Sequence, residues 1–556
     1  MRLLSVSSLF LFGLAAVVTA TPDTLQDGDD LNSGYNGEHH LDPNFVTSDR
    51  FGVEWTFRPE LDYGFERFMA KPLVYTARNG RKVLIAAASS NTIYVLDART
   101  GEVINKRQLR QPYEEPALPC GDLQPHNGIL GTPVIDRKTG TLYVFAKGYR
   151  DDNPAGPFSS VFWAHAVDAI TLEERPGFPT LIDGPASNDP QRYFVGGIHL
   201  QRPSLKLHNG VVYGAFGSGC GSFNHTGWIA AVNGRSGEVI QRFVTQSGPE
   251  APSVEGGFFA GGGGGSIWQA GTGFSTDRQD RLFVAVGDGR VFDHTFPAAE
   301  GREVGSILEG TILNLKVNRD GSLTPQDHFR LSKYSELGSS ARDQGSGGLT
   351  ILDPKYFSIP GVARKLAIAG GQSGVFNILN LDNLGGYRQG PNGTDNVIQT
   401  IPVPGTIPGL IYGNFGSYPG EGGYIYVKPV GLRSIYVYKF NRKGPEYFTL
   451  VATSEEPAST AVGSGSPVVT TNRGRPGTGI LWVADINQGL TAYHAVPQNG
   501  TLVRIPIPAV GRPKFQRPVF YDSRVYLVTT DGYVVAYGRK PRDSEQPRRQ
   551  PRWWRN

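Results

Sequence analysis

The sequence predicts an all-β fold: a single β-propeller of about eight four-stranded blades, with the ring closed by an N-terminal strand. Three observations lead to this prediction. A strand pattern recurs along most of the 556 residues, apolar runs of four to seven residues alternate with turn signals, and glycine and proline are abundant, at 73 and 40 residues. Such a composition is typical of short strands joined by tight turns.

The clearest copy of the repeat begins at Lys71. It contains an apolar strand, a turn at Asn79-Gly80, a second strand, a third strand over 92–96 and a turn over 97–101, after which a fourth strand begins. The spacing of apolar residues follows the strand period and shows no long helical stripe. Copies of the pattern begin at Lys71, Gly131, Arg202, Arg281, Lys365, Gly422, Thr478 and Arg524.

The last copy lacks a fourth strand, because the chain becomes basic and proline-rich after Gly538. The segment Val53–Phe57 is a strand that belongs to no blade. We therefore expect it to complete the last blade and to join the two ends of the chain. A ring closed in this way has few exposed strand edges.

Four segments are expected along the chain. Residues 1–20 have the layout of a secretory signal peptide, with cleavage expected after Ala20. Residues 21–50 are predicted to be disordered, residues 51–538 to form the propeller, and residues 539–556 to be a basic tail. No later stretch is long and apolar enough to cross a bilayer, so we expect a secreted, extracellular protein without a membrane span.

The formal charge of +4 comes from the tail, which carries six basic and two acidic residues after Arg539. The rest of the chain is almost neutral. A basic face of the kind that binds nucleic acid is therefore not expected.

Two further features of the sequence fit a secreted protein. Three triplets fit the N-glycosylation rule, at Asn224, Asn392 and Asn499. The two cysteines, Cys120 and Cys220, most simply form one disulfide in an oxidising compartment, with two free thiols as the alternative.

The repeat has a recognisable form in Leu96-Asp97-Ala98-Arg99-Thr100-Gly101-Glu102-Val103. It resembles the repeat of the quinoprotein alcohol dehydrogenase superfamily, whose propellers bind pyrroloquinoline quinone, over residues 51–538. Further motifs resemble a largely uncharacterised secreted subgroup, in which Cys120 and Cys220 look like a recurring pair. These motifs are Cys120-Gly121-Asp122-Leu123, residues 128–136, residues 264–269 and residues 345–348.

The resemblance implies an oxidoreductase acting on CH–OH groups, with pyrroloquinoline quinone and calcium as cofactors. In dehydrogenases of the superfamily, a tryptophan and a ring of two adjacent cysteines hold the quinone. This chain has no adjacent cysteines, and no set of calcium ligands can be matched to it residue by residue. The cofactor prediction therefore rests on the fold alone.

Loops that lead into the innermost strands line one mouth of a propeller channel, so we looked there for site residues. Asp343 is the candidate catalytic base or cation ligand, with a turn cap or a surface ion pair as its alternative role. Trp268 could stack on a planar ligand or else plug the channel. The other candidate ligand-binding residues are Gln269, His126, Asn127, Arg342, Gln344, Gln372 and Asn414.

Two main functions remain open from the sequence, beside a third in which the protein is an accessory to an extracellular or biosynthetic oxidation pathway. In the first, the central cavity binds a small polar molecule or a carbohydrate, and the protein oxidises an alcohol or sugar if it holds a quinone. In the second, the propeller is a non-catalytic binding or structural module.

Overall fold

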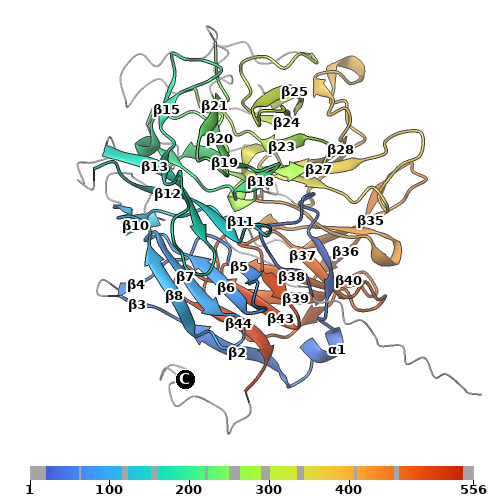
Figure 1. Ribbon diagram of the computed structural model, residues 1–556. Coiled ribbons are helices and arrows are strands. Elements are labelled where there is room, and N and C mark those ends of the chain that lie inside the picture. Colours follow the sequence, from blue (N-terminus) through green and yellow to red (C-terminus); the bar gives the residue numbers. More distant parts are fainter. Residues whose placement is uncertain are drawn as a thin grey trace, which may run out of the picture.

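The computed structural model describes residues 21–61, 64–114, 123–151, 159–219, 223–248, 263–289, 301–334, 344–405, 410–431, 434–455 and 462–541. Eight sheets of four or five strands follow one another along the chain and form a β-propeller, as predicted (Figure 1). The only α-helix among the described residues is α1 (Pro43–Val46). No helix in this part of the chain is long and apolar enough to cross a membrane.

The first four blades run from the innermost to the outermost strand in chain order. Blade 1 contains β5 (Leu73–Thr76), β6 (Lys82–Ala87), β7 (Thr92–Asp97) and β8 (Val103–Gln108). Blade 2 contains β11 (Val134–Asp136), β12 (Thr141–Tyr149), β13 (Ser160–Asp168) and β14 (Thr180–Leu181). Blade 3 contains β17 (His199–Leu200) and β18 (Lys206–His208), then β19 (Val211–Ser218), β20 (Trp228–Asn233) and β21 (Val239–Val244). Blade 4 contains β22 (Ser275–Thr276), β23 (Arg281–Ala285), β24 (Thr311–Val317) and β25 (Leu323–Arg330), with β29 (Gly386–Tyr387) added outside.

The other four blades repeat this order. Blade 5 contains β26 (Leu349–Ile351), β27 (Leu366–Gly370), β28 (Val375–Asn380) and β30 (Gln399–Pro402). Blade 6 contains β32 (Gly416–Tyr418), β33 (Tyr424–Val427), β35 (Tyr436–Phe440) and β36 (Phe448–Ser454), with β40 (Thr501–Leu502) outside. Blade 7 contains β37 (Val468–Asn472), β38 (Ile480–Asp485), β39 (Gly489–His494) and β41 (Arg504–Ile505). Blade 8 contains β42 (Val519–Tyr521), β43 (Arg524–Val528), β44 (Val534–Arg539) and β2 (Phe51–Phe57).

Four two-stranded ribbons lie outside the blades: β3 (Glu60–Leu61) with β4 (Gly64–Phe65), β9 (Tyr113–Glu114) with β10 (His126–Asn127), β15 (Gly184–Pro185) with β16 (Tyr193–Phe194), and β31 (Leu410–Ile411) with β34 (Pro429–Val430).

The ring closes as the sequence predicted. Strand β2 pairs antiparallel with β44, from Phe51 opposite Arg539 to Phe57 opposite Val534. Figure 1 shows the dark blue β2 beside the red end of the chain. The pairing gives blade 8 its fourth strand, so the first and last strands of the propeller lie in one sheet.

The cores lie between neighbouring blades. One cluster joins Ile85 and Val95 of blade 1 to Leu142 and Val144 of blade 2. Each middle strand is covered on both faces, which is why β6 and β12 read as continuous apolar runs and not as strict alternations.

The N-terminal segment differs from the expectation. Residues 21–50 were predicted to be disordered because they are polar, but the structure gives them a defined path. Strand β1 (Tyr35–His39) pairs parallel with β37, and α1 follows before β2 begins. The segment has few apolar residues because it binds to strand edges through its backbone.

The predicted glycosylation sites differ in exposure, and the other predicted features of the chain lie outside the described residues. Asn392 and Asn499 lie on exposed turns, whereas Asn224 is partly buried, with a side-chain oxygen that contacts no solvent. The signal segment, both cysteines and residues 542–556 lie outside the described residues. Cleavage, the disulfide and glycosylation therefore stay predictions.

Candidate functional site

Residues 21–41, which we call the strap, line the inside of the propeller channel. The strap binds the innermost strand of each blade in turn. Thr24 forms a bridge with Val74 of β5, the Leu25 carbonyl accepts from Ile135 of β11, and the Asp30 carboxylate accepts from Lys206 of β18. Further along, backbone carbonyls of the strap accept hydrogen bonds from blades 4 to 7: Asp30 from Thr276, Leu31 from Ile351, Ser33 from Ser417 and Gly34 from Val469. At blade 8 the strap donates instead, from Thr24 to the Phe520 carbonyl and from His40 to the Asp522 carbonyl.

This path has a simple physical cause. The innermost strand of a blade is a sheet edge with unpaired backbone groups, and such groups need partners when they are buried. The strap supplies these partners to all eight blades. It also makes the centre of the ring polar.

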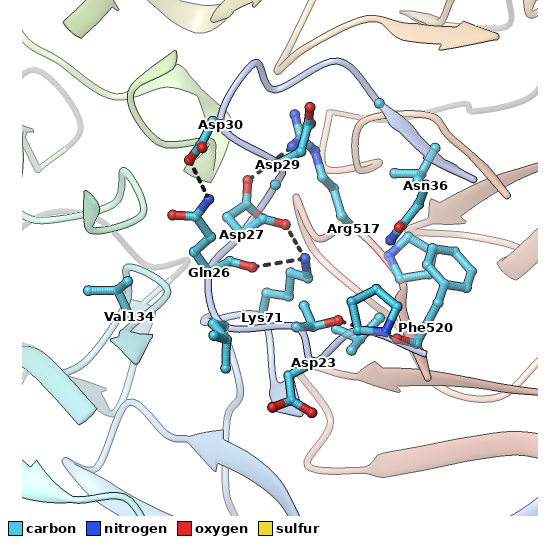
Figure 2. A pocket seen from close by; sticks show the side chains of 18 of the residues that line it. Asp23, Gln26, Asp27, Asp29, Asp30, Asn36, Lys71, Val134, Arg517 and Phe520 are labelled. Carbon is cyan, nitrogen blue, oxygen red and sulfur yellow. Dashed lines mark hydrogen bonds and ion pairs between the residues drawn. The ribbon is translucent and has the colours of Figure 1, made fainter. Parts of the chain in front are cut away.

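A pocket of about 400 Å³ lies on the channel axis inside the strap (Figure 2). One side of its wall is the strap from Pro22 to Asp30 and from Gly34 to Asn36. The rest of the wall includes Val134, Leu207, Val468, Val519 and Phe520 from four innermost strands. The volume falls in the range of small-molecule sites.

Three buried charged residues form the floor of this pocket. Lys71 donates through Nζ to the backbone carbonyl of Asp27, and Arg517 Nη1 lies 3.4 Å from the Asp27 carboxylate. Arg517 Nη1 also donates to the Asn32 side chain at 3.0 Å. Figure 2 shows Asp27, Lys71 and Arg517 converging. Burial lowers the pKa of Lys71 to about 8, because a charged side chain is disfavoured away from water.

A glycine allows the strap to approach Arg517 closely. A Cβ atom on Gly28 would collide with Arg517 Nη1 and with the Asn32 side chain. Any larger residue at this position would displace the guanidinium from Asp27.

The wall of the pocket carries three further carboxylates with different partners. Asp23 accepts from Thr76 at 2.6 Å and lies 3.6 Å from Arg137. Asp30 lies 2.7 Å from Lys206 and 2.8 Å from Arg278. Burial alone would raise the pKa of Asp30, but these two cations hold it well below its usual value.

Asp29 differs from the other three carboxylates. Among the described residues it has no ion-pair partner, and the backbone N–H of Ser33 donates to it at 2.8 Å. Asp29 is exposed and lines the pocket. Burial raises the pKa of Asp29 despite the Ser33 hydrogen bonds and the nearby Arg517.

The site predicted from the sequence lies at the end of the channel where the innermost strands begin. Trp268, Gln344 and Asn414 each come before the innermost strand of their blade. The pocket, in contrast, is lined by Leu207 and Phe520, which lie within innermost strands. Trp268 is partly buried. The rings of Phe515 and Tyr412 stand nearly perpendicular to it, with centroids at 4.9 and 6.0 Å. The apolar side chains that pack against it are Met69, Leu123, Leu130 and Leu200. We call these seven residues the plug.

Arg202 lies between the plug and the pocket. Its guanidinium donates to the carbonyls of Leu130 at 3.2 Å and Lys514 at 3.1 Å. Burial lowers the pKa of Arg202 to about 10. This side chain ties the loops of three blades together across the channel.

Two of the predicted binding residues, Gln269 and Asn414, use their side chains for hydrogen bonds within the protein. Gln269 donates to the carbonyls of Thr272 and Gly273 and accepts from the Ala285 N–H at 2.7 Å. Asn414 accepts from the Thr272 hydroxyl at 3.1 Å and donates to the Leu349 carbonyl. Both side chains are buried, so in this structure they connect blades 4, 5 and 6.

The other predicted residues are not gathered in one place. His126 and Asn127 lie in the β9–β10 ribbon, where burial lowers the pKa of His126 and the buried side-chain amide of Asn127 has no hydrogen-bond partner among the described residues. Gln344 donates to Ser373 at 3.2 Å, and Gln372 is partly exposed nearby. Asp343 and Arg342 lie outside the described residues, so their roles stay predictions.

The sequence matches no known family profile, and no curated protein is similar to it. Solved structures are similar in fold. The quinohemoprotein alcohol dehydrogenase of Pseudomonas putida superposes with a TM-score of 0.62 at 14% identity, covering 95% of this chain and 82% of its own. This chain has the quinoprotein alcohol dehydrogenase fold. The enzyme of Comamonas testosteroni gives 0.60 at 16% identity, covering 96% and 83%, and a europium-containing methanol dehydrogenase gives 0.56 at 12% identity, covering 92% and 98%.

A bound quinone would need flat surfaces parallel to its own rings. At the plug the two neighbouring aromatic rings are perpendicular to Trp268, and four apolar side chains fill the space against it. Among the described residues, no group of three or more His, Cys, Asp or Glu side chains is placed to hold a metal ion. The described residues of this mouth therefore do not fit a quinone with its cation, and we derive no step through that group.

The sequence analysis missed the axial pocket, because we expected its wall to be disordered. One signal was present: four aspartates lie within the eight residues from Asp23 to Asp30. An acidic segment that precedes a closed propeller was compatible with a strap inside the channel. The polar composition of the segment, taken alone, favoured disorder.

Proposed function

We propose that this protein is a secreted propeller that binds a small polar ligand in the axial pocket enclosed by the strap. The observation that carries the proposal is the pocket itself: about 400 Å³ on the channel axis, with buried charges on the floor and a carboxylate free on the wall. Sites of this size with a few convergent polar groups are typical of small-molecule binding. The signal segment predicted in the sequence supports secretion.

Filling the pocket tests this proposal. Leu207 lines the pocket from β18, and replacing it with tryptophan places an indole there. Leu450 is a matched control, because it is 45% exposed on the outer strand β36 of another blade. We expect Leu207→Trp to abolish binding of small polar molecules in ligand-observed NMR, and Leu450→Trp to leave it unchanged. Equal binding by both variants would contradict the proposal.

Quinone-dependent oxidation of an alcohol or sugar is the second candidate, favoured by the similarity to three dehydrogenase structures. Calorimetric titration with pyrroloquinoline quinone, with and without calcium, tests it directly, followed by dye reduction with simple alcohols and sugars. Calcium-dependent binding with dye reduction would establish a dehydrogenase. Asp343→Asn would then be expected to abolish turnover. No binding leaves the axial pocket as the functional site.

A further inference from the structure

The carboxylates around the axial pocket are not equivalent. Asp23, Asp27 and Asp30 each lie within 4 Å of a cationic side chain. Asp29 takes part in no ion pair in the described part of the chain, and among the four carboxylates that line the pocket it is the exposed one. An ionised carboxylate that lines a pocket without a counter-ion is available to accept hydrogen bonds from a ligand.

The charges nearby limit what such a donor can be. The cations that line the pocket are Lys71, Arg278 and Arg517, with Lys206 paired to Asp30, and the acids that line it are Asp23, Asp27, Asp29 and Asp30. The two signs nearly balance, so a cationic ligand would add a charge beside Lys206 and Arg517. An anionic ligand would meet Asp29 and Asp30 at the open wall. A neutral molecule with several hydroxyl groups avoids both costs.

We propose, on the basis of the function proposed above, that the pocket takes a neutral polyol or monosaccharide, which donates two adjacent hydroxyl groups to the Asp29 carboxylate. The backbone N–H of Ser33 donates to Oδ1 and the Ser33 side chain also hydrogen-bonds this carboxylate, which leaves two of its four lone-pair sites for two further donors. Hydrogen bonds to an ionised acceptor are stronger than those between neutral groups.

The pocket also offers apolar contacts to the carbon face of such a ring. Val468, Val519 and Pro518 line it with apolar atoms, and so do Val134 and Leu207. A pyranose or cyclitol ring combines hydroxyl groups at its rim with C–H groups on its faces. The pocket therefore offers a partner to each part of the molecule.

Saturation-transfer NMR with the full-length mature protein tests this inference. The probes are myo-inositol, and cis-1,2-cyclohexanediol against cyclohexanol, which differ by one hydroxyl group. Ethanolamine and inorganic phosphate serve as charged probes. We expect inositol and the diol to bind, and the diol to bind at least tenfold more tightly than cyclohexanol.

Asp29→Asn keeps the size of the side chain and removes its charge, and we expect at least a tenfold loss of inositol affinity. Asp320→Asn, in an exposed turn on the β24–β25 connection, is the matched control and should bind like the wild type. Unchanged inositol binding in Asp29→Asn would overturn the assignment. Binding of ethanolamine or phosphate without any polyol would overturn the polyol class but keep a small-ligand pocket, whereas no binding of any probe would remove both proposals.

Discussion

The two ends of the channel are closed by different means. At the end where the innermost strands begin, seven apolar and aromatic side chains from several loops form the plug around Trp268. At the other end a single polar segment, the strap, binds eight strand edges and encloses a pocket. Apolar packing fills space without needing partners, whereas polar backbone and charged groups need partners and leave room for water.

The difference between the apolar plug and the polar strap indicates which end of the channel can bind a ligand. Of the residues predicted from the sequence, Trp268 lies in the plug, and the Gln269 and Asn414 side chains form hydrogen bonds that connect neighbouring blades. The free polar groups are at the strap. The following predictions test whether the two ends differ as described.

The largest effect is expected at the buried ion pair below the pocket. Arg517→Met leaves Asp27 and Asn32 without their partner in a site where Arg517 is only 3% exposed. We expect a loss of about 3–5 kcal/mol in the free energy of unfolding, measured by denaturant titration. Arg278→Met, at 80% side-chain exposure, should cost less than about 1 kcal/mol. Similar losses in the two variants would show that the strap is not held by buried charge.

The plug should behave like an ordinary apolar core. Trp268→Ala is expected to cost about 3 kcal/mol, the lower end for a buried aromatic residue because Trp268 is only partly buried. The axial pocket should keep its polyol affinity, because the plug does not line it. A large loss of affinity with an unchanged melting temperature would instead place the ligand at Trp268.

A pH dependence should distinguish the pocket from the plug. Burial raises the pKa of Asp29 above its usual 3.8, so the folded protein binds a proton there more readily than the unfolded chain. This residue therefore favours folding at low pH, and that contribution is lost as the pH rises through the raised pKa. Polyol binding requires the carboxylate and should weaken as the pH falls through the same range, as followed by NMR titration. Asp29→Asn should abolish both dependences, and a wild-type affinity that is flat with pH would contradict the role of Asp29.

The smallest effect is expected where the strap leaves the channel. His40 Nδ1 lies 3.0 Å from the carboxylate of Asp522, which is 46% exposed. Asp522→Asn should therefore lower the free energy of unfolding by less than about 1 kcal/mol. A loss as large as that of Arg517→Met would show that the exit, and not the floor, anchors the strap.

Much of the fold was predictable because the signals were local and repeated. Turn residues such as Asn79-Gly80 and apolar runs such as 82–87 recur in each blade, so the number of blades and the closure by Val53–Phe57 follow from the sequence. The candidate site was less predictable. Loop residues such as Trp268 and Gln344 were assigned by position relative to a strand, but which polar atoms remain free depends on contacts between blades.

The sequence by itself determined the all-β class, the eight repeats and the strand that closes the ring, since strand period and turn chemistry are encoded within a few residues. Only the tertiary structure decided the place of the strap, the pairing of Asp27 with Arg517 and the solitary position of Asp29. Asp27 and Arg517 come from opposite ends of the chain and meet only because the ring closes. A polar segment has no periodic signal of its own, so its structure comes from the eight strand edges that bind it.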